Sequence, residues 1–158
     1  MKVEQLMTKG VATCTPGDTL NEAARIMWEH DCGVVPIIGE GDAPRVVAML
    51  TDRDICMAAY TRGRPLSGIC VRDAMSREIQ SCSPTTDLAE AEGLMRSAQV
   101  HRLPVVDDAG QLLGVISLAD IAREAAREVA SKRRDVTVAE IGETLAAISQ
   151  PREAAVGA

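Results

Sequence analysis

Hydrophobic positions along the chain alternate between short β-like runs and stretches with helical spacing, and this order occurs twice. Residues 3–38 align with residues 71–106 at a constant offset of 68, with nine identical pairs among 36. Beyond Pro36 the offset falls to 66, because the first copy carries two extra residues in the Gly- and Pro-containing stretch 39–44. Such stretches are typical of surface turns, which tolerate insertions. The sequence therefore predicts two copies of one structural unit.

Each copy predicts the element order β-α-β-β-α. A short β run (11–14 or 79–82) precedes a helix that we expect a capping box to open, Thr19 with Glu22 and Asp87 with Glu90. Two β-rich runs and a second helix follow: residues 34–38 and 46–50 before a helix at Thr51, and residues 103–106 and 112–116 before a helix at Ser117. The two runs should pair antiparallel, and the leading strand should join them by a crossover. The predicted fold class is α/β (α+β), with the copies packed on each other because each core is thin.

A C-terminal extension lies outside the repeat. We expect a first motif at 1–62, a linker at 63–69, a second motif at 70–130 and the extension at 131–158. A capping box at Thr137 and Glu140 opens one short amphipathic helix, about 138–149, and the end of the chain should be frayed. Its apolar stripe is formed by Val138, Ile141, Leu145 and Ile148. Because a lone helix of this length is marginal in water, it should dock on its own motifs, a second subunit or a partner protein.

Composition and charge exclude several classes of protein. The chain has no Phe, one Trp and one Tyr, so base stacking on aromatic side chains is nearly unavailable. With a net charge of −6, only the basic run 132–134 favours nucleic acid, which we do not expect as a partner. No apolar run is long enough for a bilayer and no signal-peptide pattern is seen, so we predict a cytoplasmic protein without a membrane partner. Five cysteines without a C-x-x-C spacing predict reduced, mostly buried thiols and no metal site.

Several short motifs recur in register in the two copies. The first copy carries Val35-Pro36-Ile37 and Met49-Leu50-Thr51-Asp52-Arg53-Asp54-Ile55; the second carries Leu103-Pro104-Val105-Val106-Asp107 and Gly114-Val115-Ile116-Ser117-Leu118-Ala119-Asp120-Ile121. With these motifs, residues 1 to about 130 resemble a tandem cystathionine-β-synthase (CBS) domain pair, also called a Bateman module. Residues 50–55 are also similar to small stand-alone bacterial CBS-pair proteins.

The resemblance implies a pseudo-twofold between the two motifs, with their sheets packed together and two clefts between them. Family members often bind AMP, ADP, ATP, S-adenosylmethionine or NAD in these clefts, and some bind nothing known. No cofactor is implied as a requirement. The first copy departs from the family at Ala48, where the second copy has Gly114 and the family usually has glycine. A methyl group there is expected to crowd the first cleft.

The Thr51-x-x-Asp54 and Ser117-x-x-Asp120 motifs allow two interpretations. As capping boxes they would only begin a helix. As ligand residues they would use the same geometry, because a helix N-terminus offers free N–H groups and a positive dipole to a phosphate. In proteins that the chain resembles, the matching Asp binds the ribose and the matching Thr or Ser approaches the phosphates.

Three basic side chains complete the candidate ligand site. His101 and Arg102 precede Pro104, and in similar CBS proteins such a pair points to ligand phosphates; a solvated strand edge is the simpler alternative. Their counterparts in the first copy, Gly33 and Val34, are uncharged. Arg53 stands at a helix start, where the dipole disfavours a cation unless an anion or the neighbouring acids compensate. The sequence therefore predicts two unequal sites.

Taken together, these residues favour a non-enzymatic regulatory module that senses an adenosine-containing ligand in the cleft between the two motifs. We expect it to form a homodimer and to act on an unknown effector protein. The alternative is a ligand-free dimerising scaffold or stress-response interaction protein. An enzyme or redox protein is the third hypothesis, and the chain has no P-loop, G-x-G-x-x-G or nucleophile elbow to support it. We predict no catalytic residues.

Overall fold

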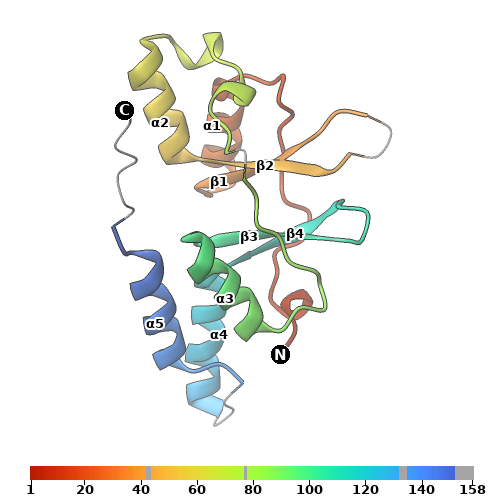
Figure 1. The fold of residues 1–158 in the computed structure, drawn as a ribbon, viewed down its shortest axis with the longest axis vertical. Helices are drawn as coiled ribbons and strands as arrows, with labels where there is room; N and C mark the ends of the chain where they lie inside the picture. Colours follow the sequence, from red (N-terminus) through yellow and green to blue (C-terminus); the bar gives the residue numbers. More distant parts are fainter. Residues whose placement is uncertain (42–43, 77, 132–134, 152–158) are drawn as a thin grey trace.

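The computed structural model describes residues 1–41, 44–76, 78–131 and 135–151. In the described residues, eight helices and strands form two units of the same order, followed by one more helix (Figure 1). The first unit holds α1 (Leu20–Glu29), β1 (Val34–Ile38), β2 (Val46–Thr51) and α2 (Asp52–Arg62). The second unit holds α3 (Leu88–Ala98), β3 (Arg102–Val106), β4 (Leu112–Ser117) and α4 (Leu118–Ser131), and α5 (Val138–Ile148) follows. Three short 3-10 helices are η1 (Val3–Gln5), η2 (Leu66–Gly68) and η3 (Val71–Asp73).

Each unit contains one antiparallel two-stranded sheet, as predicted. β1 pairs with β2 so that Val35 lies opposite Leu50, and β3 pairs with β4 so that Leu103 lies opposite Ile116. The two sheets lie next to each other in the middle of the molecule, with the helices of each unit on the outer side (Figure 1). The backbone N–H of Val46 donates to the carbonyl of Gly110 at 3.1 Å, which joins the two hairpins.

The prediction of a strand ahead of each first helix is wrong in extent. Cys14 and Cys82 each make one isolated parallel bridge, to Ile37 and Val105, and neither lies in a strand. The parallel direction agrees with a crossover connection. The ladder stops because a proline follows two residues later in each copy and cannot donate a hydrogen bond to a strand.

The segments that begin the two repeats are exchanged between the units. Val3 is fully buried in the core of the second unit, whereas its counterpart Val71 is fully buried in the core of the first unit. Thr8 pairs with Val115 through two backbone hydrogen bonds of 2.9 and 3.0 Å. The N-terminal residues are therefore part of the second unit in space, although they begin the first repeat in sequence.

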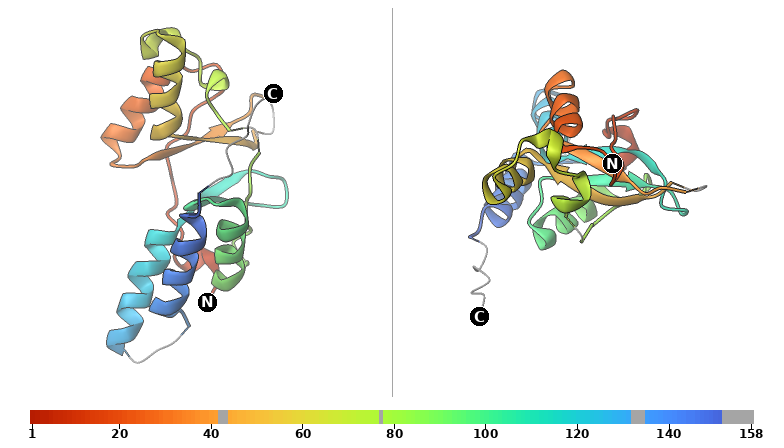
Figure 2. Two further views of the ribbon diagram at one scale, coloured as in Figure 1. Left: turned by 60° about the vertical axis from the view of Figure 1, so that its left-hand side comes forward. Right: turned by 90° about the horizontal axis from the view of Figure 1, so that it is seen from above.

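Two separate aliphatic cores result from this exchange. The first is built around Leu20, Val35, Ile37 and Leu50, and the second around Leu88, Met95, Leu103 and Ile116. Helix α5 packs on α3 and α4 of the second unit, and the left view of Figure 2 shows it between them. The first unit has no counterpart of α5 among the described residues, so α5 breaks the pseudo-symmetry of the molecule.

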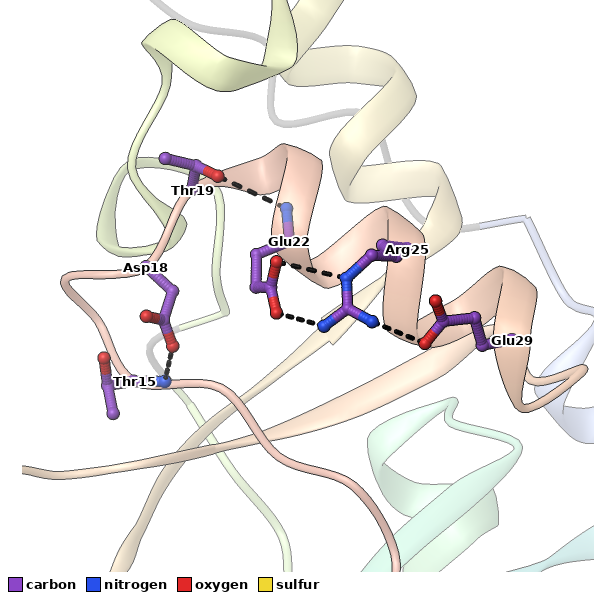
Figure 3. Close-up of polar contacts among 6 residues, drawn as sticks. All are labelled: Thr15, Asp18, Thr19, Glu22, Arg25 and Glu29. Carbon is purple, nitrogen blue, oxygen red and sulfur yellow. Dashed lines mark hydrogen bonds and ion pairs between the residues drawn. The ribbon is translucent and has the colours of Figure 1, made fainter.

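At the start of α1, only one of the two hydrogen bonds of a reciprocal capping box forms (Figure 3). The side chain of Thr19 accepts a hydrogen bond from the backbone N–H of Glu22 at 3.2 Å. The carboxylate of Glu22 does not return to Thr19, because it binds Arg25, which also pairs with Glu29. The Arg25 hydrogen bond lowers the pKa of Glu22. The predicted reciprocal capping box is therefore only half formed.

The predicted capping box at the start of α3 is wrong. Asp87 makes no side-chain cap, because its carboxylate pairs with Lys2 at 3.0 Å. The Lys2 hydrogen bond lowers the pKa of Asp87. The first amide of α3, on Leu88, donates instead to the carbonyl of Met1 at 3.1 Å. The exchanged N-terminal segment thus replaces the side-chain cap.

Candidate functional site

The two T/S-x-x-D motifs begin α2 and α4 as reciprocal capping boxes. At α2, Thr51 Oγ1 accepts from the Asp54 N–H at 3.2 Å, and Asp54 Oδ2 accepts from the Thr51 N–H and hydroxyl at 2.9 and 2.7 Å. At α4 the same bonds between Ser117 and Asp120 measure 3.1, 2.9 and 2.6 Å. The capping interpretation of both motifs is confirmed. Their role toward a ligand stays a prediction.

The two aspartates differ in their second carboxylate oxygen. Asp120 Oδ1 pairs with Arg123, whose side chain is largely exposed. Among the described residues, Asp54 Oδ1 accepts no hydrogen bond. Both carboxyl groups are partly buried and fixed by their own helix start. Each therefore presents one oriented oxygen beside a helix N-terminus, where the backbone dipole is positive.

A cavity of about 330 Å³ lies beside the N-terminus of α4. His101 and Arg102, at the entry to β3, form its basic part, and Ser117 adds the hydroxyl of the helix cap. Within the described parts of the chain, neither the His101 nor the Arg102 side chain makes a hydrogen bond or ion pair. The other lining residues are apolar: Leu118, Ala119, Ala122, Ile141 and Leu145. This cavity can bind a ligand with an anionic end and an apolar part.

The cavity of the first unit has the opposite character. It measures about 420 Å³ and lies between α1 and α2. Its lining contains Gly33 and Asp52 where the second unit has His101 and Leu118, and it also contains Asp31. The full lining is Ala24, Met27, Trp28, Asp31, Cys32, Gly33, Asp52 and Ile55. Two carboxylates without a basic side chain disfavour an anion in this cavity.

The structure brings together four of the seven candidate residues. His101, Arg102 and Ser117 line one cavity, and Asp120 is bonded to Ser117. Thr51, Arg53 and Asp54 lie apart from them, at the start of α2, and none lines the first-unit cavity. Arg53 is exposed, and its backbone N–H donates to the Asp52 carboxylate at 2.7 Å.

Sequence reasoning did not include α5 in the candidate site. Ile141 and Leu145 form part of the second-unit cavity, although they belong to the C-terminal extension. The apolar stripe in the sequence indicates that α5 docks somewhere. It does not indicate that the docked helix lines the cavity that carries His101 and Arg102.

The difference between Ala48 and Gly114 affects strand pairing. A Cβ atom on Gly114 would lie 2.5 Å from the Thr8 carbonyl oxygen, so only glycine permits the close approach of the N-terminal segment. Ala48 is fully buried, and Ser76, the counterpart of Thr8, makes one backbone bond to Met49 O at 3.1 Å. Ala48 lines neither cavity.

Comparisons with known proteins agree with this architecture. The CBS domain family model matches residues 3–60 and 71–127. A CBS domain-containing protein of Bacillus subtilis, YhcV, is 38% identical over 120 residues, which cover 76% of this chain and 82% of that protein. The chain belongs to the CBS domain family and contains a tandem pair of CBS motifs, which identifies it as a regulatory type of module.

Solved CBS-pair structures have the same fold. Hypoxic Response Protein I, solved with two coordinated zinc ions, is 32% identical with a TM-score of 0.68, covering 78% of this chain and 98% of that chain. The CBS domain pair of protein MJ0100, solved with 5′-methylthioadenosine and S-adenosyl-L-methionine, is 21% identical with a TM-score of 0.69, covering 81% and 98%. In the present chain, the described residues contain no group of three His, Cys, Asp or Glu side chains placed to hold a metal ion. None of the described helices is both long and apolar enough to span a bilayer.

Proposed function

We propose that the chain is a non-enzymatic regulatory module that binds an adenosine-containing ligand, with AMP, ADP, ATP, S-adenosylmethionine and NAD as the candidates. The observation that carries this proposal is the basic cavity of the second unit. In a chain of net charge −6, His101 and Arg102 lie at a helix N-terminus without a partner in the described structure. A phosphate placed there would meet a bidentate cation and the positive end of α4.

The remaining candidate residues fit the two ends of such a ligand. Ser117 would donate to a phosphate, and Asp120 would accept hydrogen bonds from the ribose hydroxyls once Arg123 releases its outer oxygen. Thr51, Arg53 and Asp54 would form a second, weaker site, because the adjacent cavity carries Asp31 and Asp52. The protein named MJ0100 supports this proposal, because its CBS pair was solved with adenosine-containing ligands.

A thermal-shift panel of the five ligands tests this proposal. A ligand at about 100 times its dissociation constant adds about 2.7 kcal/mol of stability. Asp120→Ala and the matched control Asp54→Ala each remove a capping box and should each cost about 1 kcal/mol without ligand. We expect Asp120→Ala to abolish the ligand-induced shift and Asp54→Ala to retain it. A flat panel at millimolar ligand contradicts the sensor proposal and favours a ligand-free scaffold.

A homodimer is supported by a second observation. Trp28 and Tyr60, the two aromatic residues of the chain, are 88% and 81% exposed, on α1 and α2. The groove between these helices corresponds to the groove between α3 and α4, which α5 fills. In the repeat, Trp28 of α1 is the counterpart of Arg96 of α3, which donates a hydrogen bond to Thr144 of α5. We therefore propose that a second copy covers the α1/α2 face, since exposed aromatic residues are typical of interface centres.

A further inference from the structure

Helix α5 forms one wall of the basic cavity. Ile141 and Leu145, one helical turn apart on α5, line the same cavity as His101, Arg102 and Ser117. The family match ends at residue 127, so α5 lies outside both matched ranges. This wall is therefore a feature of the extension in this chain, added to the CBS pair.

A neighbouring face of α5 is fixed to α3 by buried polar contacts. Thr144 is fully buried; its hydroxyl donates to Glu92 Oε2 at 2.7 Å and accepts from Arg96 Nη1 at 2.8 Å. Glu92 is also buried, so the contact is costly to break. Ile148 belongs to the second core and is 6% exposed.

Leu145 has a different environment from its neighbour Thr144. Leu145 is 47% exposed, although the preceding residue, Thr144, is fully buried against α3. Leu145 lines the cavity and does not belong to the core cluster of the second unit. Thr144 thus holds α5 in place, while Leu145 presents an apolar surface to a molecule bound in the cavity.

We propose that Ile141 and Leu145 contact the bound ligand, so that ligand binding and the docking of α5 are energetically coupled. This inference rests on the function proposed above. A ligand that reaches His101 and Arg102 enters a cavity of about 330 Å³, of which α5 supplies an apolar wall. The ligand buries that wall and strengthens the docked position of α5, and by linkage the docked helix strengthens ligand binding to the same degree.

In the part of the chain that the structure describes, the matching position in the first unit has no such wall. Its cavity is lined by Trp28 and Asp31, with no residue of a docked C-terminal helix. The coupling therefore applies to the second-unit site alone. It makes α5 the element whose mobility reports occupancy of that site.

Titration calorimetry on the full chain tests the inference, with the strongest ligand from the panel as the probe. Leu145→Ala removes cavity surface and should weaken binding about fivefold. Val138→Ala is the matched control, because Val138 is an exposed apolar residue of the same helix that does not line the cavity. We expect its affinity to equal that of the parent. Melting temperatures of both variants show whether α5 remains docked.

Hydrogen exchange gives the second readout. We expect the amides of α5 to exchange more slowly when the parent is saturated with ligand. If the parent binds the ligand, but Leu145→Ala binds equally tightly and α5 exchange does not change, the inference is overturned and the proposed function stands. If the parent binds none of the five ligands, both are overturned.

Discussion

At the scale of single residues, Cys14 and Cys82 show how the repeat places equivalent side chains in equivalent surroundings. Both thiols are buried, each at an isolated parallel bridge ahead of the first helix of its unit. Burial raises the pKa of each thiol to about 11, with a smaller contribution from the nearby Asp18 and Glu90, respectively. Since the thiolate is the reactive form, these cysteines are inert at neutral pH. This favours a packing role over a redox role.

We predict that iodoacetamide at pH 8 modifies the exposed Cys56 and leaves Cys14 and Cys82 intact in the folded chain. Mass spectrometry of peptides measures this directly, and urea-unfolded chain is the control in which all three react. If Cys14 in the folded chain were modified as fast as Cys56, the assignment of Cys14 as an unreactive buried thiol would be refuted.

The raised pKa of these buried thiols predicts that the free energy of unfolding depends on pH. The pKa of the Cys14 thiol in the folded state lies above its unfolded value of 9.0. The contribution of this thiol to the free energy of unfolding is therefore complete below pH 9. It is lost as the pH rises through about 11.

Local sequence patterns predicted some residue contacts and missed others. The boxes at Thr51, Ser117 and Thr137 form as predicted because the acid three residues away keeps one carboxylate oxygen on the cap, even where Arg123 binds the other oxygen of Asp120. The boxes at Thr19 and Asp87 do not form fully, because Arg25 and Lys2 bind the acids instead. Lys2 is far from Asp87 in sequence, so no local pattern could show this contact.

At the scale of elements, the positions of the helices and hairpins follow from hydrophobic spacing, and the docking of α5 does not. The sequence predicted a helix at about 138–149, and α5 spans Val138–Ile148. Of the predicted stripe, Ile148 is buried, but Val138 and Leu145 are 60% and 47% exposed. The buried face turns toward Thr144 because Glu92 and Arg96 supply partners for its hydroxyl.

Apolar spacing cannot identify a polar residue, such as Thr144, in the face by which a helix packs on its neighbours. The same limit explains why the cavity wall of α5 was not predicted as part of the site. His101, Arg102, Ser117 and Asp120 were predicted from their motifs, and the structure does bring them together. The basic run 132–134 and the final residues of the chain, ending at 156–158, which we predicted to be frayed, lie outside the described residues.

At the scale of the whole molecule, α5 makes two similar units unequal. It covers the helical groove of the second unit and leaves that of the first unit open. The second unit therefore carries a basic cavity with an added wall, whereas the first carries an acidic cavity next to an exposed tryptophan. In the account proposed here, one unit binds the ligand and the other forms the dimer.

We predict that Trp28→Glu converts a dimer into a monomer at tens of micromolar chain, because it places a charge in the proposed interface. Val129→Glu is the control, since Val129 is also an exposed apolar residue but lies on α4. Light scattering gives the mass of each variant. A parent that is already monomeric, or a Trp28→Glu variant that stays dimeric, would contradict the assignment of this face.

The inequality of the two units is the central claim, and calorimetric titration of the parent chain with the strongest panel ligand tests it most directly. We expect one tight site per chain, and an Arg102→Ala variant that binds about tenfold to a hundredfold more weakly, as the loss of a charge-assisted hydrogen bond implies. Two sites of equal affinity per chain, or an Arg102→Ala variant that binds as tightly as the parent, would contradict the account.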